Sequence, residues 1–487
     1  MKLIKLISIS LCLMLLFAAC SNDKKPDDKQ SSFKPVIKFK DCDPYDCGTM
    51  EVPMDYRNID GRKIKIELIR KPAENKKQKL GVLLVNPGGP GASGMNIVRD
   101  SASAVFPPEI LERFDIIGWD PRGAGKSSKV TCDTNLDFLF EGVDYSPDNE
   151  AEREKLVEVN TLLGEKCEEE DAELLKFLDT ESSVRDMDEM RKALGEDEIN
   201  FLGFSYGSSL GQIYATLFPD NFRTMVIDGI IDLAETAKET SAEQVRGFEN
   251  SIGNFFDYCR RQSCSYSQGQ DPETKYLEIM QKIDQNPIAS PNERNFTLGP
   301  AQLDLATSYF LYSGEVGWKN LDAALNDVNR GFPSKLLVGF SAYAGRSVGG
   351  QYDGSYSSFL TIGCADGYTA KPQGMFDLAE TMVQEAPIFG MSGVLLGMPC
   401  STWPSNSAAE TFKVKTSKSK PILVIGTVGD PATPVTWARS AAKQISNSAY
   451  LEVDGDTHTS FAQGNTCVDE LVVKYFLSAK SPGDQKC

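Results

Sequence analysis

Short apolar runs alternate with helical patterns in the first half of this chain, and this alternation constrains the fold more than any other feature. Leu80 to Val85 (LGVLLV) is a continuous apolar run that ends in Asn-Pro-Gly-Gly-Pro-Gly, as a buried strand of a parallel sheet does. Similar runs occur at Phe114 to Gly118, Ile199 to Leu202 and Thr224 to Asp228, after a half-exposed strand pattern at Lys63 to Arg70. Helical patterns open at Thr180 and Ser205 and stop at Gly195 and Pro219. This order predicts an α/β fold with a parallel sheet.

The alternation fades between residues 231 and 418, where the pattern is mostly helical. It resumes with strands at Pro421 to Gly426 and Ala449 to Val453, followed by a helix around Val468 to Phe476. The simplest architecture is one α/β domain made of both ends of the chain, residues 41–230 and 419–487. A largely helical insertion, residues 231–418, would then lie between two strands. A chain of 487 residues has room for a domain with an insertion of that size.

The first residues have the pattern of an export signal. Two lysines, Lys2 and Lys5, precede an apolar stretch that is too short to span a bilayer comfortably, and Ala18-Ala19 stand directly before Cys20. Small residues before a cysteine resemble a bacterial lipoprotein cleavage site. We therefore expect residues 1–19 to be a signal peptide and residues 20–40 to be a lipidated Cys20 with a flexible tether that holds the protein at a membrane of the cell envelope. Ordinary secretion, with Cys20 incidental, is the alternative.

The charge and the histidine content exclude several classes of function. Lysine and arginine number 51 against 69 aspartate and glutamate residues, which gives a formal charge of −18, and no basic run occurs, which argues against a nucleic-acid partner. The only histidine is His458, so multi-histidine metal sites and histidine-cluster pH switches are excluded. We expect no cofactor, no metal, and contact with a membrane only through the lipid anchor. The oligomeric state is not predicted.

Ten cysteines follow Cys20 and fall into neighbouring pairs, which are Cys42/Cys47, Cys132/Cys167, Cys259/Cys264, Cys364/Cys400 and Cys467/Cys487. An exported chain with ten cysteines favours disulfides, although the sequence leaves their connectivity open. We expect sequential neighbours to pair, because two of the pairs close loops of four residues. A zinc site is a weak alternative, since the spacing is C-x4-C and no histidine lies near any pair.

The sequence Gly203-Phe204-Ser205-Tyr206-Gly207 matches G-x-S-x-G between an expected strand and an expected helix. This context is typical of a nucleophile elbow, a tight turn that lifts the serine hydroxyl above the carboxyl edge of the sheet. The helix that follows directs its first N–H groups at the site and favours developing negative charge there. We therefore predict that Ser205 is a catalytic nucleophile. The alternative is a glycine-rich turn whose serine only caps the helix.

A serine hydroxyl needs a base, and an imidazole base can only be His458, in the loop before the final helix. The third member should be a buried carboxylate that fixes the imidazole tautomer and stabilises the imidazolium. Asp430 follows the Pro421 to Gly426 strand and is our prediction for this role. Its competitors are Asp228, after an earlier strand, and Asp454 and Asp456, which are more suited to shaping the histidine's own turn.

The oxyanion formed by attack needs two preorganised donors. We assign one to the backbone N–H of Tyr206, directly after the nucleophile. The other should come from the loop Asn86-Pro87-Gly88-Gly89-Pro90-Gly91, and by analogy with the H-G-G loop of related hydrolases we assign it to Gly89. A plain glycine and proline turn is the alternative reading of this loop.

Four motifs together resemble one family, and the resemblance covers nearly everything after residue 40. Gly88-Gly89-Pro90-Gly91, the run from Asp120 to Ser127 (DPRGAGKS), the G-x-S-x-G motif, and Gly429-Asp430-Pro431 with His458 are similar to the proline iminopeptidase and tripeptidyl aminopeptidase group of α/β-hydrolases. The match is closer to the secreted tripeptidyl aminopeptidase branch. The resemblance implies an α/β-hydrolase fold with a helical cap and a serine exopeptidase that cuts from the free N-terminus of a peptide. It also implies acidic cap residues around the substrate's ammonium group, of which Asp366 is a weak candidate.

The predicted reaction is hydrolysis through an acyl-enzyme, with a peptide as the substrate. An esterase or lactonase acting on small molecules is the alternative within the hydrolases, because a triad does not distinguish an ester from an amide. A non-catalytic lipoprotein that binds peptides is a third hypothesis, although a binding protein has no need of an ordered triad.

Overall fold

The computed structural model describes residues 33–367, 370–404, 412–416 and 420–487. Residues Pro35–Cys487 form one compact unit. The expected signal peptide, residues 1–19, and the expected lipidation site Cys20 lie outside the described residues.

The core of this unit is a twisted sheet of ten strands in the order β1-β2-β3-β5-β4-β6-β7-β10-β11-β12. The strands are β1 (Ile37–Cys42), β2 (Tyr45–Pro53), β3 (Lys63–Lys71), β4 (Val82–Asn86), β5 (Asp115–Asp120), β6 (Ile199–Phe204), β7 (Phe222–Asp228), β10 (Ile422–Thr427), β11 (Ser448–Val453) and β12 (Gln485–Lys486). The pairs β1/β2, β2/β3 and β3/β5 are antiparallel. The remaining pairs, from β5/β4 to β11/β12 in the strand order, are parallel. The predicted parallel sheet is confirmed, with an antiparallel edge that the sequence did not indicate.

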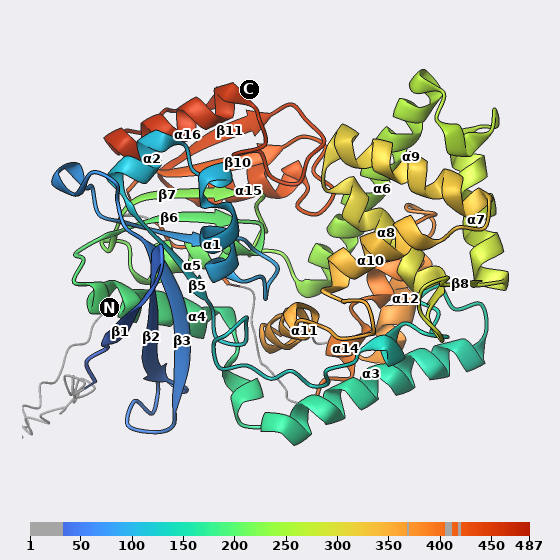
Figure 1. Cartoon of the computed structure of the whole chain (residues 1–487), viewed down its shortest axis with the longest axis horizontal. Helices are drawn as coiled ribbons and strands as arrows, with labels where there is room; N and C mark the ends of the chain where they lie inside the picture. The colour runs from blue at the N-terminus through green and yellow to red at the C-terminus, as the bar shows by residue number, and fades with distance from the viewer. Residues whose placement is uncertain (1–32, 368–369, 405–411, 417–419) are drawn as a thin grey trace, which may run out of the picture. The chain divides into compact units, whose positions relative to one another are not determined.

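The sheet joins the two ends of the chain. β7, from the first part, pairs in parallel with β10, from the last part, so that Ile425 stands opposite Asp228 (Figure 1). The alternating side chains of β4 show why both faces are covered: Leu83 and Val85 pack on one side, and Val82 and Leu84 on the other.

One face is covered by α1 (Gly94–Val105), α2 (Pro108–Arg113) and α16 (Thr466–Ser478), and the other by α4 (Thr180–Leu194), α5 (Tyr206–Leu217) and α15 (Val435–Gln444). α4 starts at an Asp179 N-cap and ends at Gly195, which has the left-handed conformation that favours glycine. These boundaries agree with those expected from the sequence.

The residues between β7 and β10 form a largely helical cap, drawn from green to orange in Figure 1. Its helices are α6 (Ala237–Gln262), α7 (Pro272–Gln285), α8 (Pro300–Leu311), α9 (Gly314–Asn329), α10 (Ser334–Ala344), α11 (Ser355–Ala365), α12 (Pro372–Met382), α13 (Gly390–Leu395) and α14 (Met398–Ser401). A short hairpin of β8 (Ile288–Ala289) and β9 (Thr297–Leu298) interrupts them. The cap core is continuous with the α4/α5 face of the sheet.

A long helix that precedes the G-x-S-x-G motif also packs on the cap. α3 (Glu150–Asp171) buries the stripe Leu156, Val159, Leu163 and Cys167 and runs below the cap helices (Figure 1). The loop before α3 is tied to the cap as well, because Glu141 accepts hydrogen bonds from the N–H of Thr297 and from Gln302 Nε2. The first part of the chain therefore contributes to the cap layer.

The ten cysteines within the described residues form five disulfides between sequential neighbours, which confirms the expected pairing; the bonds are Cys42–Cys47, Cys132–Cys167, Cys259–Cys264, Cys364–Cys400 and Cys467–Cys487. Cys132–Cys167 joins the loop after β5 to α3, and Cys364–Cys400 joins α11 to α14. These two disulfides thus link parts of the cap layer that are distant in sequence.

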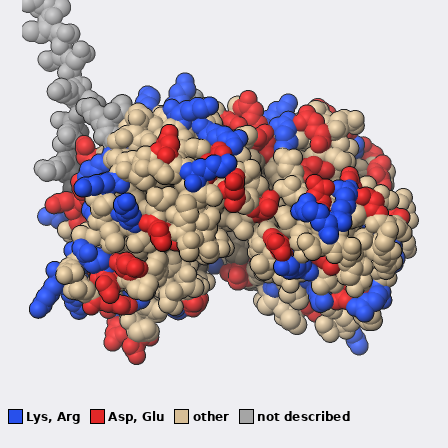
Figure 2. Space-filling model, turned by 90° about the horizontal axis from the view of Figure 1, so that it is seen from above, with Lys and Arg blue, Asp and Glu red and all other residues tan. Residues whose placement is uncertain are grey.

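The face drawn in Figure 2 carries interspersed basic and acidic side chains. The surplus of acidic residues in the sequence therefore does not form one continuous patch on this face. Within the described ranges, no helix combines the length and apolar character needed to cross a membrane.

Candidate active site

Ser205 sits on a sharp turn between β6 and α5. Its backbone has φ 54° and ψ −120°, an uncommon conformation for a residue with a side chain, and its N–H donates to the carbonyl of Asp228 at 2.8 Å. The flanking glycines are required by space: a Cβ on Gly203 would lie 2.3 Å from the carbonyl oxygen of Gly207. Although Ser205 is the N-cap residue of α5, its side chain makes no capping hydrogen bond. The alternative in which this serine only caps the helix is therefore wrong.

His458 and Asp430 form the central contact of the site. The imidazole Nδ1 lies 2.9 Å from Oδ1 and 3.0 Å from Oδ2 of Asp430. The Asp430 side chain is fully buried and that of His458 is 10% exposed. The carboxylate also accepts hydrogen bonds from the N–H groups of Ala432, Thr433 and Thr459. These donors fix the carboxylate in the orientation that meets Nδ1.

Asp228 is the main alternative to Asp430 as the acid of the triad, but it contacts the backbone of the loop that contains His458. Its Oδ2 accepts hydrogen bonds from the N–H groups of Ser460 and Phe461, at 2.9 and 2.8 Å. Burial raises the pKa of its carboxyl to about 7. Asp228 therefore holds the backbone just after His458, while the imidazole itself meets Asp430.

The two aspartates next to the histidine in sequence do not contact its ring. Asp454 pairs with Lys486 at 3.3 Å, and Asp456 accepts a hydrogen bond from Asn254 Nδ2 at 2.9 Å. Both shape the histidine loop, as the sequence suggested.

Ser205 and His458 lie against the same two residues at the end of β7. The carbonyl of Asp228 accepts the Ser205 N–H, and a Cβ on the next residue, Gly229, would lie 3.4 Å from His458 Cε1. Three segments that are distant in sequence, around Ser205, Asp430 and His458, thus meet at the carboxyl ends of β6, β7 and β10.

The glycine-rich loop after β4 lies directly against the serine. Gly88 has φ +100°, and a Cβ there would come within 2.7 Å of the Phe204 carbonyl and 2.9 Å of Ser205 Cβ. The Gly88 N–H donates to Asn86 Oδ1 at 3.0 Å. Gly89 follows with φ +108°, and among the described residues its N–H has no hydrogen-bond partner.

Tyr206, the first residue of α5, is held through its side chain. Its hydroxyl lies 2.7 Å from Thr180 Oγ1, and Thr180 donates its N–H to Asp366 at 2.6 Å and its hydroxyl to the same carboxylate at 2.5 Å. Burial raises the pKa of Asp366 to about 7. Asp366, at the end of α11, is thus a half-buried anchor between cap and core, and its carboxylate is hydrogen-bonded to Thr180.

One cap residue in contact with the histidine was missed by the sequence analysis. The carbonyl of Tyr312, just after α8, accepts the N–H of His458 at 2.8 Å. The two rings stand edge to face, with centroids 4.8 Å apart and an interplanar angle of 88°. No local motif marks a tyrosine that reaches the site from the cap.

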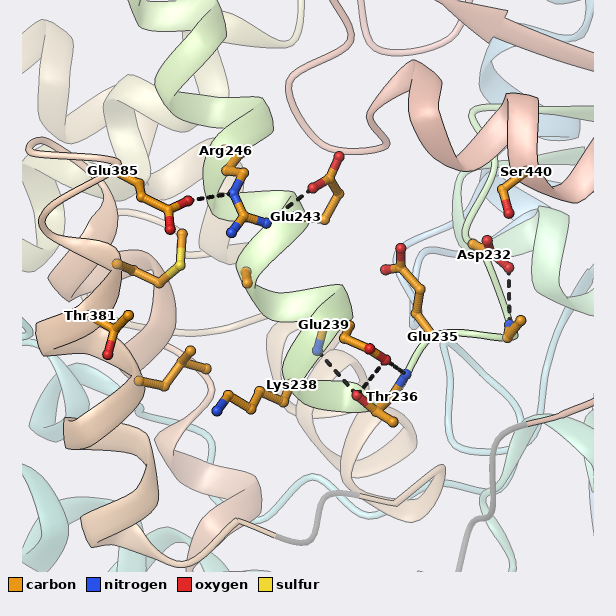
Figure 3. A pocket seen from close by; sticks show the side chains of 14 residues that line it. Asp232, Glu235, Thr236, Lys238, Glu239, Glu243, Arg246, Thr381, Glu385 and Ser440 are labelled. Carbon is orange, nitrogen blue, oxygen red and sulfur yellow. Dashed lines mark hydrogen bonds and ion pairs between the residues drawn. The ribbon is translucent and has the colours of Figure 1, made fainter.

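A separate pocket of about 750 Å³ lies beside the first half of α6 (Figure 3). Its acidic lining residues include Asp232, Glu235, Glu239, Glu243 and Glu385. Arg246 reaches between Glu243 and Glu385, and Glu239 folds back on Thr236 (Figure 3). These carboxylates are bound within the chain, and no predicted site residue belongs to the lining. Across the described ranges, no group of three or more histidine, cysteine, aspartate or glutamate residues could hold a metal ion.

Comparison with known sequences places the chain in a family. A family model described as "alpha/beta hydrolase fold" matches residues 81–266, and one described as "TAP-like protein" matches residues 386–487. The chain is 30% identical over 460 residues to the serine protease Hip1 of Mycobacterium tuberculosis, covering 90% of this chain and 86% of the relative. The chain therefore belongs to the α/β-hydrolase family.

Two further relatives cover a similar length. The chain is 26% identical over 467 residues to the tripeptidyl aminopeptidase of Streptomyces lividans, covering 91% of this chain and 85% of the relative. It is 33% identical over 450 residues to the carboxylesterase B of Mycobacterium tuberculosis, covering 90% and 85%. Within the α/β-hydrolases the chain groups with these proteins, and its residues 386–487 form a TAP-like region.

Proposed function

We propose that this protein is an exported serine peptidase that hydrolyses peptides from their free N-terminus through an acyl-enzyme. Ser205 is the nucleophile, His458 the general base and Asp430 the acid that orients it. The observation that carries this proposal is the contact between His458 Nδ1 and the buried carboxylate of Asp430, at 2.9 Å. This contact supports the Nδ1–H tautomer, which leaves Nε2 free to take a proton from a serine hydroxyl.

The reaction proceeds in two halves. His458 takes the Ser205 proton as Oγ attacks the scissile carbonyl, and the imidazolium then protonates the leaving amine. In the second half His458 activates a water molecule, which attacks the acyl-enzyme and releases Ser205. Asp430 orients the imidazole and stabilises the imidazolium in both halves.

The oxyanion is held by the N–H groups of Tyr206 and Gly89. Tyr206 is in the first turn of α5, where the N–H has no acceptor within the helix. The loop after β4 offers few other donors, because Pro87 and Pro90 have no N–H and the Gly88 N–H is bound to Asn86. This elimination supports Gly89 as the second donor.

Names of the relatives favour a peptide substrate, since two of the three are a serine protease and a tripeptidyl aminopeptidase. The relative named carboxylesterase B supports an esterase as the second candidate, because the same triad cleaves both bonds. Comparing kcat/KM on a free peptide amide and its N-acetylated form separates them. An exopeptidase that binds the free ammonium group should lose about 100-fold or more when this group is acetylated, since removing one member of a charge pair at a binding site is costly. Equal rates on both forms, with faster cleavage of short esters, would favour the esterase.

A fluorophosphonate probe tests the catalytic assignment. We expect the probe to label Ser205, as read by peptide mass spectrometry, and Ser205→Ala to abolish both labelling and turnover. Ser440→Ala, in α15, is the matched control and should keep both. An unlabelled wild-type protein would favour the peptide-binding lipoprotein and reject the enzyme.

We also propose export and lipidation at Cys20. Five disulfides support an oxidising compartment, since such bonds are rare in the cytosol of most cells. On this proposal residues 1–19 are removed and the residues between Cys20 and β1 tether the hydrolase. The tether ends earlier than the expected residue 40, because Ile37–Cys42 form β1 and pair with β2. The core then comprises β1 to residue 230 together with 419–487, and the cap insertion comprises 231–418. Cys20→Ser should release the protein from the membrane fraction without changing its kcat. Retention of that variant on membranes would reject the anchor.

A further inference from the structure

We infer that the cap residue Tyr312 is a positioning residue for His458, so that the base is held jointly by the core and by the cap. The inference rests on the proposed function, in which His458 is the general base. Neither the family motifs nor the triad itself requires a contact from the cap.

Two neighbouring backbone contacts join the cap to the histidine loop. The carbonyl of Tyr312 accepts the N–H of His458 at 2.8 Å, and Ser313 forms an antiparallel bridge with Thr457. Gly314 follows with φ +52°, and a Cβ there would lie 3.3 Å from Thr457 Cγ2. Three consecutive cap residues therefore contact this loop. The segment that contains His458 pairs with the cap over a short stretch, as two antiparallel strands do.

The Tyr312 ring restricts the imidazole directly. It stands perpendicular to the His458 ring with 4.8 Å between centroids, which is within the range of favourable edge-to-face packing. An imidazole that turned away from Asp430 would lose this contact as well as its hydrogen bond. The Tyr312 ring thus favours the orientation in which Nδ1 faces the carboxylate.

Tyr312 is itself fixed by other parts of the cap. Its ring packs against Phe248 of α6 and Tyr343 of α10, with centroid separations of 6.0 and 6.3 Å. Phe248 in turn packs on Phe389, before α13. The position of the imidazole therefore depends on several cap helices through one tyrosine.

The core holds the other side of the same loop. Asp430 meets the His458 ring, and Asp228 accepts from Ser460 and Phe461. The titratable groups facing the imidazole region are thus Asp430 and Asp228 from the core and Tyr312 from the cap. Truncating Tyr312 leaves both carboxylates in place, so its effect can be separated from theirs.

The test uses the fact that His458 is the only histidine in the chain. Full-length protein without a histidine tag, labelled with 13C at histidine Cε1, gives one imidazole signal, whose position and width follow the ring directly. We compare wild type, Tyr312→Ala, Tyr312→Leu and Tyr312→Phe. Tyr309→Ala is the matched control, because Tyr309 lies in the last turn of α8, just before Tyr312, is 41% exposed and packs on Phe310.

We expect Tyr312→Ala and Tyr312→Leu to shift or broaden the His458 signal. They should lower kcat by about 10–100-fold with KM within about twofold of wild type, since a small misplacement of a reacting group costs that much. Tyr312→Phe and Tyr309→Ala should behave as wild type in both measurements. Tyr312→Leu keeps most of the apolar volume, so it stays informative if the alanine variant does not fold.

An unchanged His458 signal and unchanged kcat in a folded Tyr312→Leu variant would overturn the inference. A loss confined to KM would also overturn it, because it would place Tyr312 in substrate binding alone. Failure of the proposed function is a separate result: wild-type protein would then lack Ser205-dependent turnover, while the His458 signal would still report whether Tyr312 holds the ring.

Discussion

Thr180 donates both its N–H and its hydroxyl to Asp366, and so joins the first turn of α4 to the end of α11. The same hydroxyl lies 2.7 Å from the Tyr206 hydroxyl, directly after the proposed nucleophile. A hydrogen-bond network of buried and half-buried groups thus links the cap to the start of α5. Networks of this kind are costly to break, because each remaining polar group stays buried without its partner.

Removing the Thr180 hydroxyl should therefore destabilise the fold. We expect Thr180→Val to lower the free energy of unfolding by about 1–3 kcal/mol, since Asp366 and Tyr206 each lose a partner. Thr180→Ser keeps the hydroxyl and is the matched control. Urea unfolding followed by circular dichroism gives both values, and a valine variant as stable as wild type would contradict the network.

The two carboxylates near His458 should differ sharply in their effect on turnover. We expect Asp430→Asn to lower kcat by about 10⁴-fold, because the amide cannot hold the tautomer that the base needs. Asp228→Asn should stay within about tenfold of wild type, since its amide oxygen can still accept a backbone N–H. Kinetics on one peptide substrate decide between them, and the reverse ranking would make Asp228 the triad acid.

Gly88 should not tolerate a side chain. A Cβ would lie 2.7 Å from the Phe204 carbonyl, and φ is +100°, so Gly88→Ala should displace the loop and slow fluorophosphonate labelling of Ser205. Displacing one oxyanion donor corresponds to about 10²–10³-fold in kcat. Gly142→Ala is the control, because Gly142 also has positive φ but a Cβ there meets no atom within 4 Å. Equal labelling rates for the two variants would argue against a loop that contacts the serine.

The fold should become less stable as the pH rises toward neutrality. Burial raises the pKa of three carboxyls, Asp228, Asp304 and Asp366, from 3.8 to about 7. The folded state binds these protons more readily than the unfolded state does. Their contribution to stability is thus complete below about pH 4 and is lost as the pH rises through about 7.

Unfolding midpoints in urea at about pH 5 and about pH 8 check this dependence. We expect the higher midpoint at the lower pH, and a smaller difference between the two in Asp304→Asn, which removes one of the three titrations. A midpoint that is independent of pH in this range, or that rises with it, would show that these carboxyls titrate normally.

The strands and helices that bear the site were predictable because their signals are local. The continuous apolar run of β4, the glycine that ends α4 and the G-x-S-x-G motif around Ser205 each occupy only a few residues. Each of these elements could therefore be predicted from its own short stretch of sequence. The order of Ser205, Asp430 and His458 along the chain then placed them at neighbouring strand ends. The structure brings these three segments together.

The contacts between cap and core were not predictable, because they join residues that no local pattern connects. Asp366 lies between Ala365 and Gly367 and has the sequence context of an exposed turn, yet it is half-buried and accepts two hydrogen bonds from Thr180. Tyr312 follows a helix that is buried over most of its length, and only the fold places it on His458. α3 was missed for another reason: its buried stripe is narrow and is surrounded by acidic residues.

During synthesis of the chain, the cap is made after the proposed nucleophile and before the other two residues of the proposed triad. The chain makes Ser205 first, the whole insertion next, and Asp430 and His458 last. A partly made chain therefore holds a serine hydroxyl with no imidazole to activate it. The cap helices have already been translated when His458 is added. A nascent chain therefore never holds the complete proposed triad without the cap.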